Sequence, residues 1–297
     1  MKKLKIGKES WIFLIAICVS FCFIGGNYLY KKNLEEARIK AKIERSKEEA
    51  QKAEEAKVEE IPKDISDTKV IKYLKEFQKR AKSDKRYNEV IKNSKEYQPD
   101  VLKLLYNNKE TLDFVLSKSS LKMPSIFVKI DEKCGNGVIP MLQQWDPKWG
   151  WYNYGENIIA LNGCGPTSLA MVITGLTGND GINPMEIAKY SDDNGYHEKA
   201  GTNWDLMTDV TEQYGVKGSR IDITKESFEN ELNNGKPIIC SVSKGYFTDE
   251  GHFIVIAGIK DGKLIIHDPN SIEKSKKLWE FDKIKNQIKA AWSYSLE

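Results

Sequence analysis

The chain has 297 residues, of which 30% are charged and 40% hydrophobic, so it is long enough for one or two folded domains. Its 46 Lys and Arg against 43 Asp and Glu leave a net charge of +3, which gives no global reason to expect a nucleic-acid partner. Five cysteines are too few for a disulfide scaffold, and 21 Gly with 9 Pro exclude a fibrous or fully disordered chain.

The N-terminus carries a long uncharged stretch. Residues 11–30 contain no charge, and about 20 apolar residues are what a helix needs to cross a bilayer. Lysines at positions 2, 3, 5 and 8 precede it, which predicts a cytoplasmic tail over 1–10 and everything after residue 30 outside the cell. The alternative is a cleaved signal peptide, but no small-residue cleavage site follows. We therefore expect a single-pass anchor in the cell membrane.

Residues 31–62 are dense in charge. Glu36/Lys40 and Glu48/Lys52 are spaced i,i+4, which supports a solvated helix, and no Gly or Pro occurs before Pro62. The apolar positions form no sustained heptad stripe, which argues against a strong coiled coil. We predict a helical spacer and leave open a disordered charged linker.

A small helical region is predicted over 66–123. Val70, Leu74, Phe77 and Ala81 recur at helical spacing after Asp67, a good N-cap residue. Shorter apolar groups follow near 90–91, 101–105 and 112–115. These helices need something else to pack on, and nothing in them suggests chemistry.

The sequence changes character at 138–297, where Gly, Trp and Tyr become frequent. Short β-rich runs at 237–242, 253–259 and 264–267 predict strands. About 160 residues are enough for one domain with its own core.

Cys164 lies in the motif Asn162-Gly163-Cys164-Gly165-Pro166. Asn-Gly predicts a turn and Pro166 suits a first helical turn, so a buried helix should begin here and stop near Gly175. A cysteine at a helix N-terminus is biased toward the thiolate. Gly163 and Gly165 would let a substrate backbone come close. The alternative is a buried, inert cysteine.

His252 opens an apolar run that continues through Asp261-Gly262 into a second run ending at Asp268. Asp-Gly between two such runs predicts a hairpin. A two-residue turn pairs Asp268 with Val255, whereas a one-residue slip pairs it with Ile254, on the face of His252. The register is open, and with it whether His252 and Asp268 meet.

Cys, His and Asp in this order are the groups that nucleophilic acyl transfer uses. The run 140–149, NGCGPTSLAMV, Gly201–Trp204, GHFIVIAG and HDPN together resemble the peptidase-family-thirty-nine-like group of the papain-like cysteine peptidases. The stretch 110–115 also resembles the region that precedes this domain in bacterial members.

The resemblance covers 138 to about 292 and implies a papain-like α+β fold. It implies Cys164 as nucleophile, His252 as base, Asp268 as orienting acid, and Gln144 rather than Gln143 as oxyanion donor. Predicted substrate contacts are Trp145, Gly163, Gly165, Trp204 and Gly251. The aromatic residues near Trp145 are either groove lining or core.

Namesake enzymes of the broader family are joined to transporters and trim leader peptides. This chain has no G-x-x-x-x-G-K-[ST] motif and one predicted span, so we expect instead a surface peptidase acting on peptides or proteins, with cell-wall peptides one candidate class. A peptide- or glycan-binding module and a transglutaminase or amidase are the alternatives.

We expect no cofactor and no metal, because no Cys/His pair has zinc spacing. His267 is expected to be a packed strand residue and His197 a surface loop residue. Cys240 is expected in a buried strand. A disulfide between Cys134 and Cys240 is left open.

Overall fold

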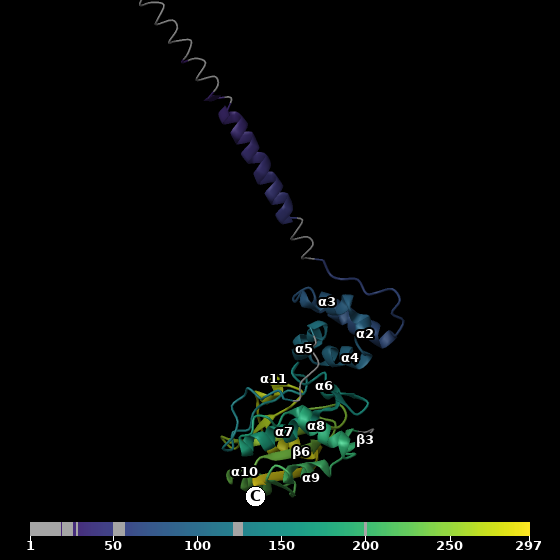
Figure 1. Cartoon of the computed structure of the whole chain (residues 1–297), viewed down its shortest axis with the longest axis vertical. Coiled ribbons are helices and arrows are strands. Elements are labelled where there is room, and N and C mark those ends of the chain that lie inside the picture. Colours follow the sequence, from purple (N-terminus) through teal and green to yellow (C-terminus); the bar gives the residue numbers. More distant parts are fainter. Residues whose placement is uncertain (1–18, 20–25, 28, 50–56, 121–126, 199–200) are drawn as a thin grey trace, which may run out of the picture. The chain divides into compact units, whose positions relative to one another are not determined.

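The computed structural model describes residues 19, 26–27, 29–49, 57–120, 127–198 and 201–297 (Figure 1). The chain divides into two compact units, residues 1–59 and 60–297. In the first unit, residues 29–49 are helical with every side chain exposed.

Among these described residues, no helix is both long and apolar enough to cross a membrane. The span predicted over 11–30 lies almost wholly outside the described residues.

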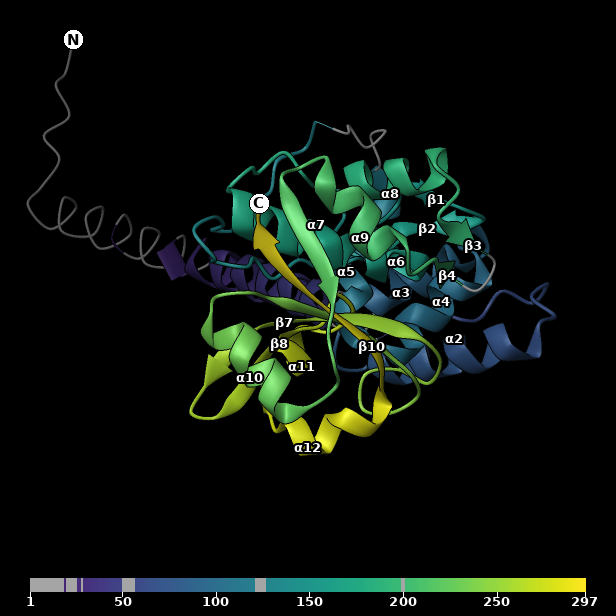
Figure 2. The ribbon, with the colours of Figure 1, turned by 90° about the horizontal axis from the view of Figure 1, so that it is seen from below.

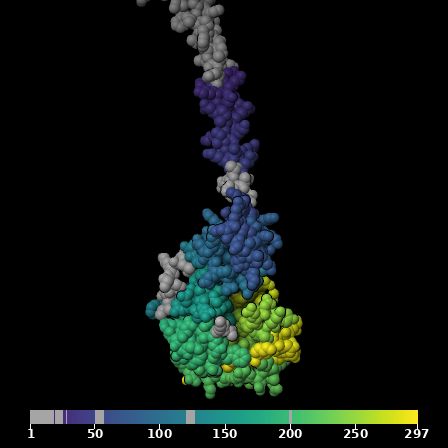
Figure 3. Space-filling model, turned by 90° about the vertical axis from the view of Figure 1, so that its right-hand side faces the viewer, coloured from purple at the N-terminus to yellow at the C-terminus, as the bar shows by residue number. Residues whose placement is uncertain are grey.

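The helical region opens the second unit. The predicted cap is confirmed, since the Asp67 carboxylate accepts hydrogen bonds from the backbone N–H groups of Lys69 and Val70. The region packs against the C-terminal domain (Figure 3, helical region in blue). In this contact Phe114 stacks on Trp151 with ring centroids 4.4 Å apart. Its helices are α2 (Thr68–Arg80), α3 (Arg86–Lys92), α4 (Pro99–Asn107) and α5 (Leu112–Leu116).

The C-terminal domain mixes helices with a six-stranded antiparallel sheet of strand order β5-β10-β6-β7-β8-β9. The sheet strands are β5 (Val216–Arg220), β6 (Ile238–Val242), β7 (His252–Lys260), β8 (Lys263–His267), β9 (Leu278–Trp279) and β10 (Ile288–Leu296). Two small hairpins are β1 (Asn153–Tyr154) with β2 (Asn157–Ile158), and β3 (His197–Glu198) with β4 (Gly201–Thr202). The helices are α6 (Ile159–Asn162), α7 (Cys164–Thr177), α8 (Pro184–Asp193), α9 (Leu206–Glu212), α10 (Lys225–Asn233), α11 (Ile272–Ser275) and α12 (Phe281–Ile284).

The sheet has an apolar core on each face. Helices α7, α8 and α9 cover one face and α10 with α12 the other (Figure 2). Alternate strand residues supply the two cores: Val255 packs toward α7, and Ile254 and Ile256 pack toward α10. The three predicted strands are confirmed as β6, β7 and β8.

Helix α7 is the buried helix that the sequence predicts, and it ends later than expected. It continues past Gly175 to Thr177 and stops at Gly178, whose φ of 74° is the left-handed conformation that glycine adopts freely. Gly175 instead allows close packing, because a Cβ there would lie 2.4 Å from the Ile139 side chain.

The β7–β8 hairpin settles the open register. Asp261 and Gly262 form the turn, with φ of 52° and 70°, and Lys260 pairs with Lys263. The register then shifts between Ile256 and Gly258, because Ala257 is an extra residue on β7. Val255 consequently pairs with His267, and one further step places Asp268 opposite Ile254.

Candidate active site

Cys164 is the first residue of α7, as the sequence predicts, and is half-buried. The chain reaches it through a tight turn in which the Gly163 N–H donates to the Ile159 carbonyl over 2.7 Å. A Cβ at Gly163 would lie 2.6 Å from that carbonyl oxygen, and one at Gly165 would lie 2.7 Å from Thr202 Oγ1. The two glycines therefore allow the protein to pack tightly around the cysteine, which is a different reason from the substrate approach that we expected.

His252 and Asp268 lie together. His252 Nε2 is 2.8 Å from Asp268 Oδ1, and the two residues are 8% and 0% exposed. The same Oδ1 accepts the Asn270 backbone N–H over 2.8 Å, which fixes the carboxylate. Asp268 holds Nε2 of the His252 ring. The Cys164 thiol hydrogen-bonds to the same side chain, so the ring nitrogen left for it is Nδ1.

The charges of the three groups support one another. Burial alone would raise the pKa of Cys164, but the hydrogen bond and positive charge of His252 outweigh it, helped by the N–H groups of Phe253 and Gly165, and the pKa is lowered. Burial alone would lower the pKa of His252, but the charge and hydrogen bond of Asp268, with Cys164, raise it to about 10. Both shifts favour a thiolate beside an imidazolium over the neutral pair.

Gln144, not Gln143, lies beside this cluster. Gln144 lines the cleft that contains Cys164 and His252, and its Nε2 donates to the Ala160 carbonyl over 2.8 Å. Its backbone N–H donates to the Pro269 carbonyl over 2.7 Å, which ties it to the loop after Asp268. Gln143 is buried outside the cleft lining. The role of Gln144 as oxyanion donor stays a prediction.

The cleft has a volume of about 620 Å³. Of the predicted substrate contacts, only Gly251 lines it. Trp145 is 7% exposed and donates its Nε1–H to the Asn270 carbonyl, and Trp204 lies edge-on to Trp292 under the Arg220 guanidinium. Trp145 is thus packed in the protein, whereas Trp204 is 39% exposed and lies outside the cleft lining.

The remaining candidates lie elsewhere. His267 in β8 contacts the Pro140 carbonyl, and His197 lies in β3 against Tyr154 rather than in a loop. Cys134 and Cys240 are both free thiols, so the disulfide left open by the sequence is not formed. Cys240 is fully buried in β6, as expected.

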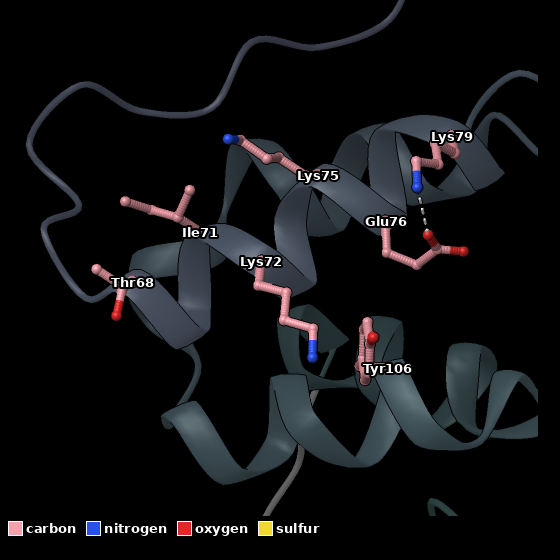
Figure 4. Close-up of a pocket in the computed structure, with 7 residues that line it drawn as sticks. All are labelled: Thr68, Ile71, Lys72, Lys75, Glu76, Lys79 and Tyr106. Atoms are coloured by element: carbon pink, nitrogen blue, oxygen red, sulfur yellow. Dashed lines mark hydrogen bonds and ion pairs between the residues drawn. The ribbon is translucent and has the colours of Figure 1, made fainter.

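A second hollow, of about 490 Å³, lies in the helical region (Figure 4). It is lined by six residues of α2 together with Tyr106 of α4, and three of them are lysines. Its lining contains no cysteine or histidine, so of these two hollows only the cleft at Cys164 holds groups suited to nucleophilic chemistry.

Comparison with known proteins assigns the C-terminal domain to a family. The Peptidase C39-like family model matches residues 138–295, more than half of the chain. The chain belongs to the Peptidase C39-like family. No curated protein matches it.

Two solved structures resemble this Peptidase C39-like chain. The peptidase domain of Streptococcus ComA, described as a bi-functional ABC transporter in quorum sensing, is 22% identical, with 46% of this chain and 93% of that one covered and a TM-score of 0.35. A Bacillus anthracis protein assigned to the C39-like peptidases is 17% identical, with 56% and 99% covered and a TM-score of 0.32. The assignment to the family rests on the family model.

Some residues of the cleft had no signal in the sequence. Asp100, Lys103, Leu104 and Asn107 of α4 line it together with Cys164, although they precede the matched region. Charged residues on an amphipathic helix normally face water, so the local sequence gave no sign that these residues line a cleft.

Proposed function

We propose that this chain is a cysteine peptidase that hydrolyses peptide or amide bonds with Cys164, His252 and Asp268. The observation that carries the proposal is the arrangement of the three: a cysteine of lowered pKa at the start of α7, a histidine of raised pKa beside it, and a buried carboxylate 2.8 Å from the histidine. Membership of the Peptidase C39-like family supports it independently.

The reaction follows from these charges. The Cys164 thiolate attacks the carbonyl carbon, and the C–S bond forms as the carbonyl electrons move to oxygen. His252 then gives its Nδ1 proton to the amine as the C–N bond breaks. Water, losing a proton to the imidazole, attacks the thioester and releases the acid and the thiolate. Asp268 holds the ring and stabilises its positive charge throughout.

The oxyanion needs donors that are already oriented. Gln144 is held by Ala160 through one of its two Nε2 hydrogens, which leaves the other for the oxyanion. The backbone N–H of Cys164 has no carbonyl partner within α7, since it opens the helix, and is a candidate second donor.

The test is a cleavage screen with the full-length chain and its Cys164→Ala variant, read by mass spectrometry on peptide and cell-wall fragment libraries. We expect cleavage by the wild type alone. Products joined to an added amine would indicate a transglutaminase. Cleavage by both proteins, or by neither, would contradict the proposal, and binding without cleavage would favour a receptor module.

The proposal includes the location of the enzyme. An anchor over 11–30, preceded by four lysines, would hold the tail inside and the peptidase outside the cell. Treating intact cells with an external protease tests this. Digestion of the C-terminal domain, with a cytoplasmic control protein left whole, is expected; protection of the domain in intact cells would contradict it.

A further inference from the structure

One wall of the cleft comes from outside the region that the family model matches. Asp100, Lys103, Leu104 and Asn107 line it, and they follow the spacing i, i+3, i+4, i+7, which is a single face of α4. Val101, Leu102 and Leu105 occupy the other face and are buried. Helix α4 thus turns one continuous face toward Cys164.

This wall is held firmly in place. Asn108, just after α4, donates its Nδ2–H to the Asn270 carbonyl over 2.6 Å, and Asn270 itself lines the cleft. The Glu110 carboxylate accepts hydrogen bonds from Ser271 Oγ and from the backbone N–H groups of Ile272 and Glu273, at 3.0–3.1 Å. These bonds connect the segment just after α4 to the loop after Asp268 and to the first turn of α11.

The cleft has an excess of negative charge. Its charged lining residues other than the catalytic cluster are Asp100, Asp249 and Glu250 against one cation, Lys103. Across the described parts of the chain, none of these four side chains takes part in an ion pair. Unpaired carboxylates around a cleft attract a cationic ligand.

A buried polar group points to a ligand that carries a hydrogen-bond donor. Gln144 is 3% exposed and lines the cleft, yet its Oε1 has no hydrogen-bond partner among the described residues. A buried acceptor without a donor is costly, which favours a ligand that brings an N–H group.

We infer that α4 is a specificity wall of the cleft and that the enzyme selects peptides carrying a positive charge, a Lys or Arg side chain or a free amine, next to the bond to be cleaved. The inference rests on the proposed peptidase function only for the cleavage step, because the preference for a positive charge also exists in binding. Asp100 is the residue of α4 that supplies the attraction.

The experiment compares two pentapeptides, identical except for Lys or Glu at the centre, binding to the full-length Cys164→Ala chain by calorimetry at low ionic strength. We expect the Lys peptide to bind about tenfold more tightly, with the ratio falling as salt is added. Adding Asp100→Lys should abolish the preference. Glu89→Lys, an exposed carboxylate of α3 outside the cleft, is the matched control and should leave it unchanged.

Equal affinity for the two peptides, including no binding of either, would overturn the inference, as would an equal effect of Glu89→Lys and Asp100→Lys. The wild-type chain given a mixed peptide library supplies the second readout. There the same charge preference should appear mainly in KM. Selective binding of the Lys peptide without turnover would contradict the peptidase proposal and would still support α4 as the specificity wall.

Discussion

The N-terminus of α7 and the middle of β6 each hold a cysteine of the same domain, and the two thiols differ in chemistry. Cys164 lies where a helix begins, beside His252, and its pKa is lowered. Cys240 lies fully buried between apolar neighbours of the sheet, and burial alone raises its pKa. The reactivity of a cysteine is therefore set by the charges and N–H groups around it.

The largest difference should appear when each cysteine is removed. Cys164→Ala should lower kcat/KM by about 10⁵-fold, because the nucleophile is lost and only binding and the oxyanion donors remain. Cys240→Ala should leave kcat/KM within about threefold and cost about 1 kcal/mol of stability for the lost sulfur. Peptide cleavage assays and thermal unfolding measure both. Comparable losses of activity in the two variants would remove the distinction.

Asp268→Asn should have the next largest effect. An amide no longer stabilises the imidazolium and can favour the wrong tautomer, so kcat should fall about 10²–10⁴-fold with little change in KM. We expect the pKa of His252 to fall in this variant, since Asp268 is the main group that raises it. Asp261→Asn at the hairpin tip is the control, because asparagine tolerates its positive φ. A normal pH profile for Asp268→Asn would contradict the assignment.

Alkylation compares the thiols directly. At pH 7, iodoacetamide should label Cys164 at least about tenfold faster than Cys134 or Cys240, whose pKa values are both raised by burial. The alkylation rate of Cys164 should already be high at pH values below the usual thiol pKa of about 8.5. It should then stay level until His252 loses its proton near pH 10. Peptide mapping by mass spectrometry gives the three rates. Equal, slow labelling would count against a thiolate at Cys164.

The smallest effect should come from Glu110. Glu110→Gln weakens the acceptor of three hydrogen bonds on the loop after Asp268, so we expect about 1 kcal/mol less stability and a several-fold lower kcat. Glu273→Gln, an exposed carboxylate of α11, is the control. A loss of stability without any change in kcat, or in the fall of kcat at high pH, would limit Glu110 to a structural role.

Much of the fold could be predicted from local signals in the sequence. The Asp67 cap, the helix beginning at Cys164 and the Asp261-Gly262 hairpin were all readable, because capping and turn formation depend on neighbouring residues. The end of α7 was misplaced, because a glycine can either end a helix or allow close packing, and only the tertiary contact of Gly175 with Ile139 tells which.

The candidate site was only partly predictable. The order of Cys164, His252 and Asp268 indicated the chemistry, but the meeting of His252 and Asp268 depends on the β-bulge at Ala257, which no pattern in β7 reveals. The wall from α4 was missed for a related reason. Its approach to Cys164 depends on bonds between residues more than 160 positions apart, such as Asn108 with Asn270 and Glu110 with Ile272.

The bulge at Ala257 also limits how this hairpin can change. Side chains alternate along a strand, so a regular ladder that paired Ala257 with Ile266 would place Asp268 opposite Val255 and turn its carboxylate to the opposite face of the sheet from His252. Deleting Ala257 would remove the bulge and leave Ile256 opposite Ile266, which preserves the phase, whereas a single residue added between Ile256 and His252 would invert it. Changes of length on the tip side of the bulge therefore keep His252 and Asp268 together, whereas the stretch between the bulge and each of these residues is fixed in length, a constraint on any redesign of this domain.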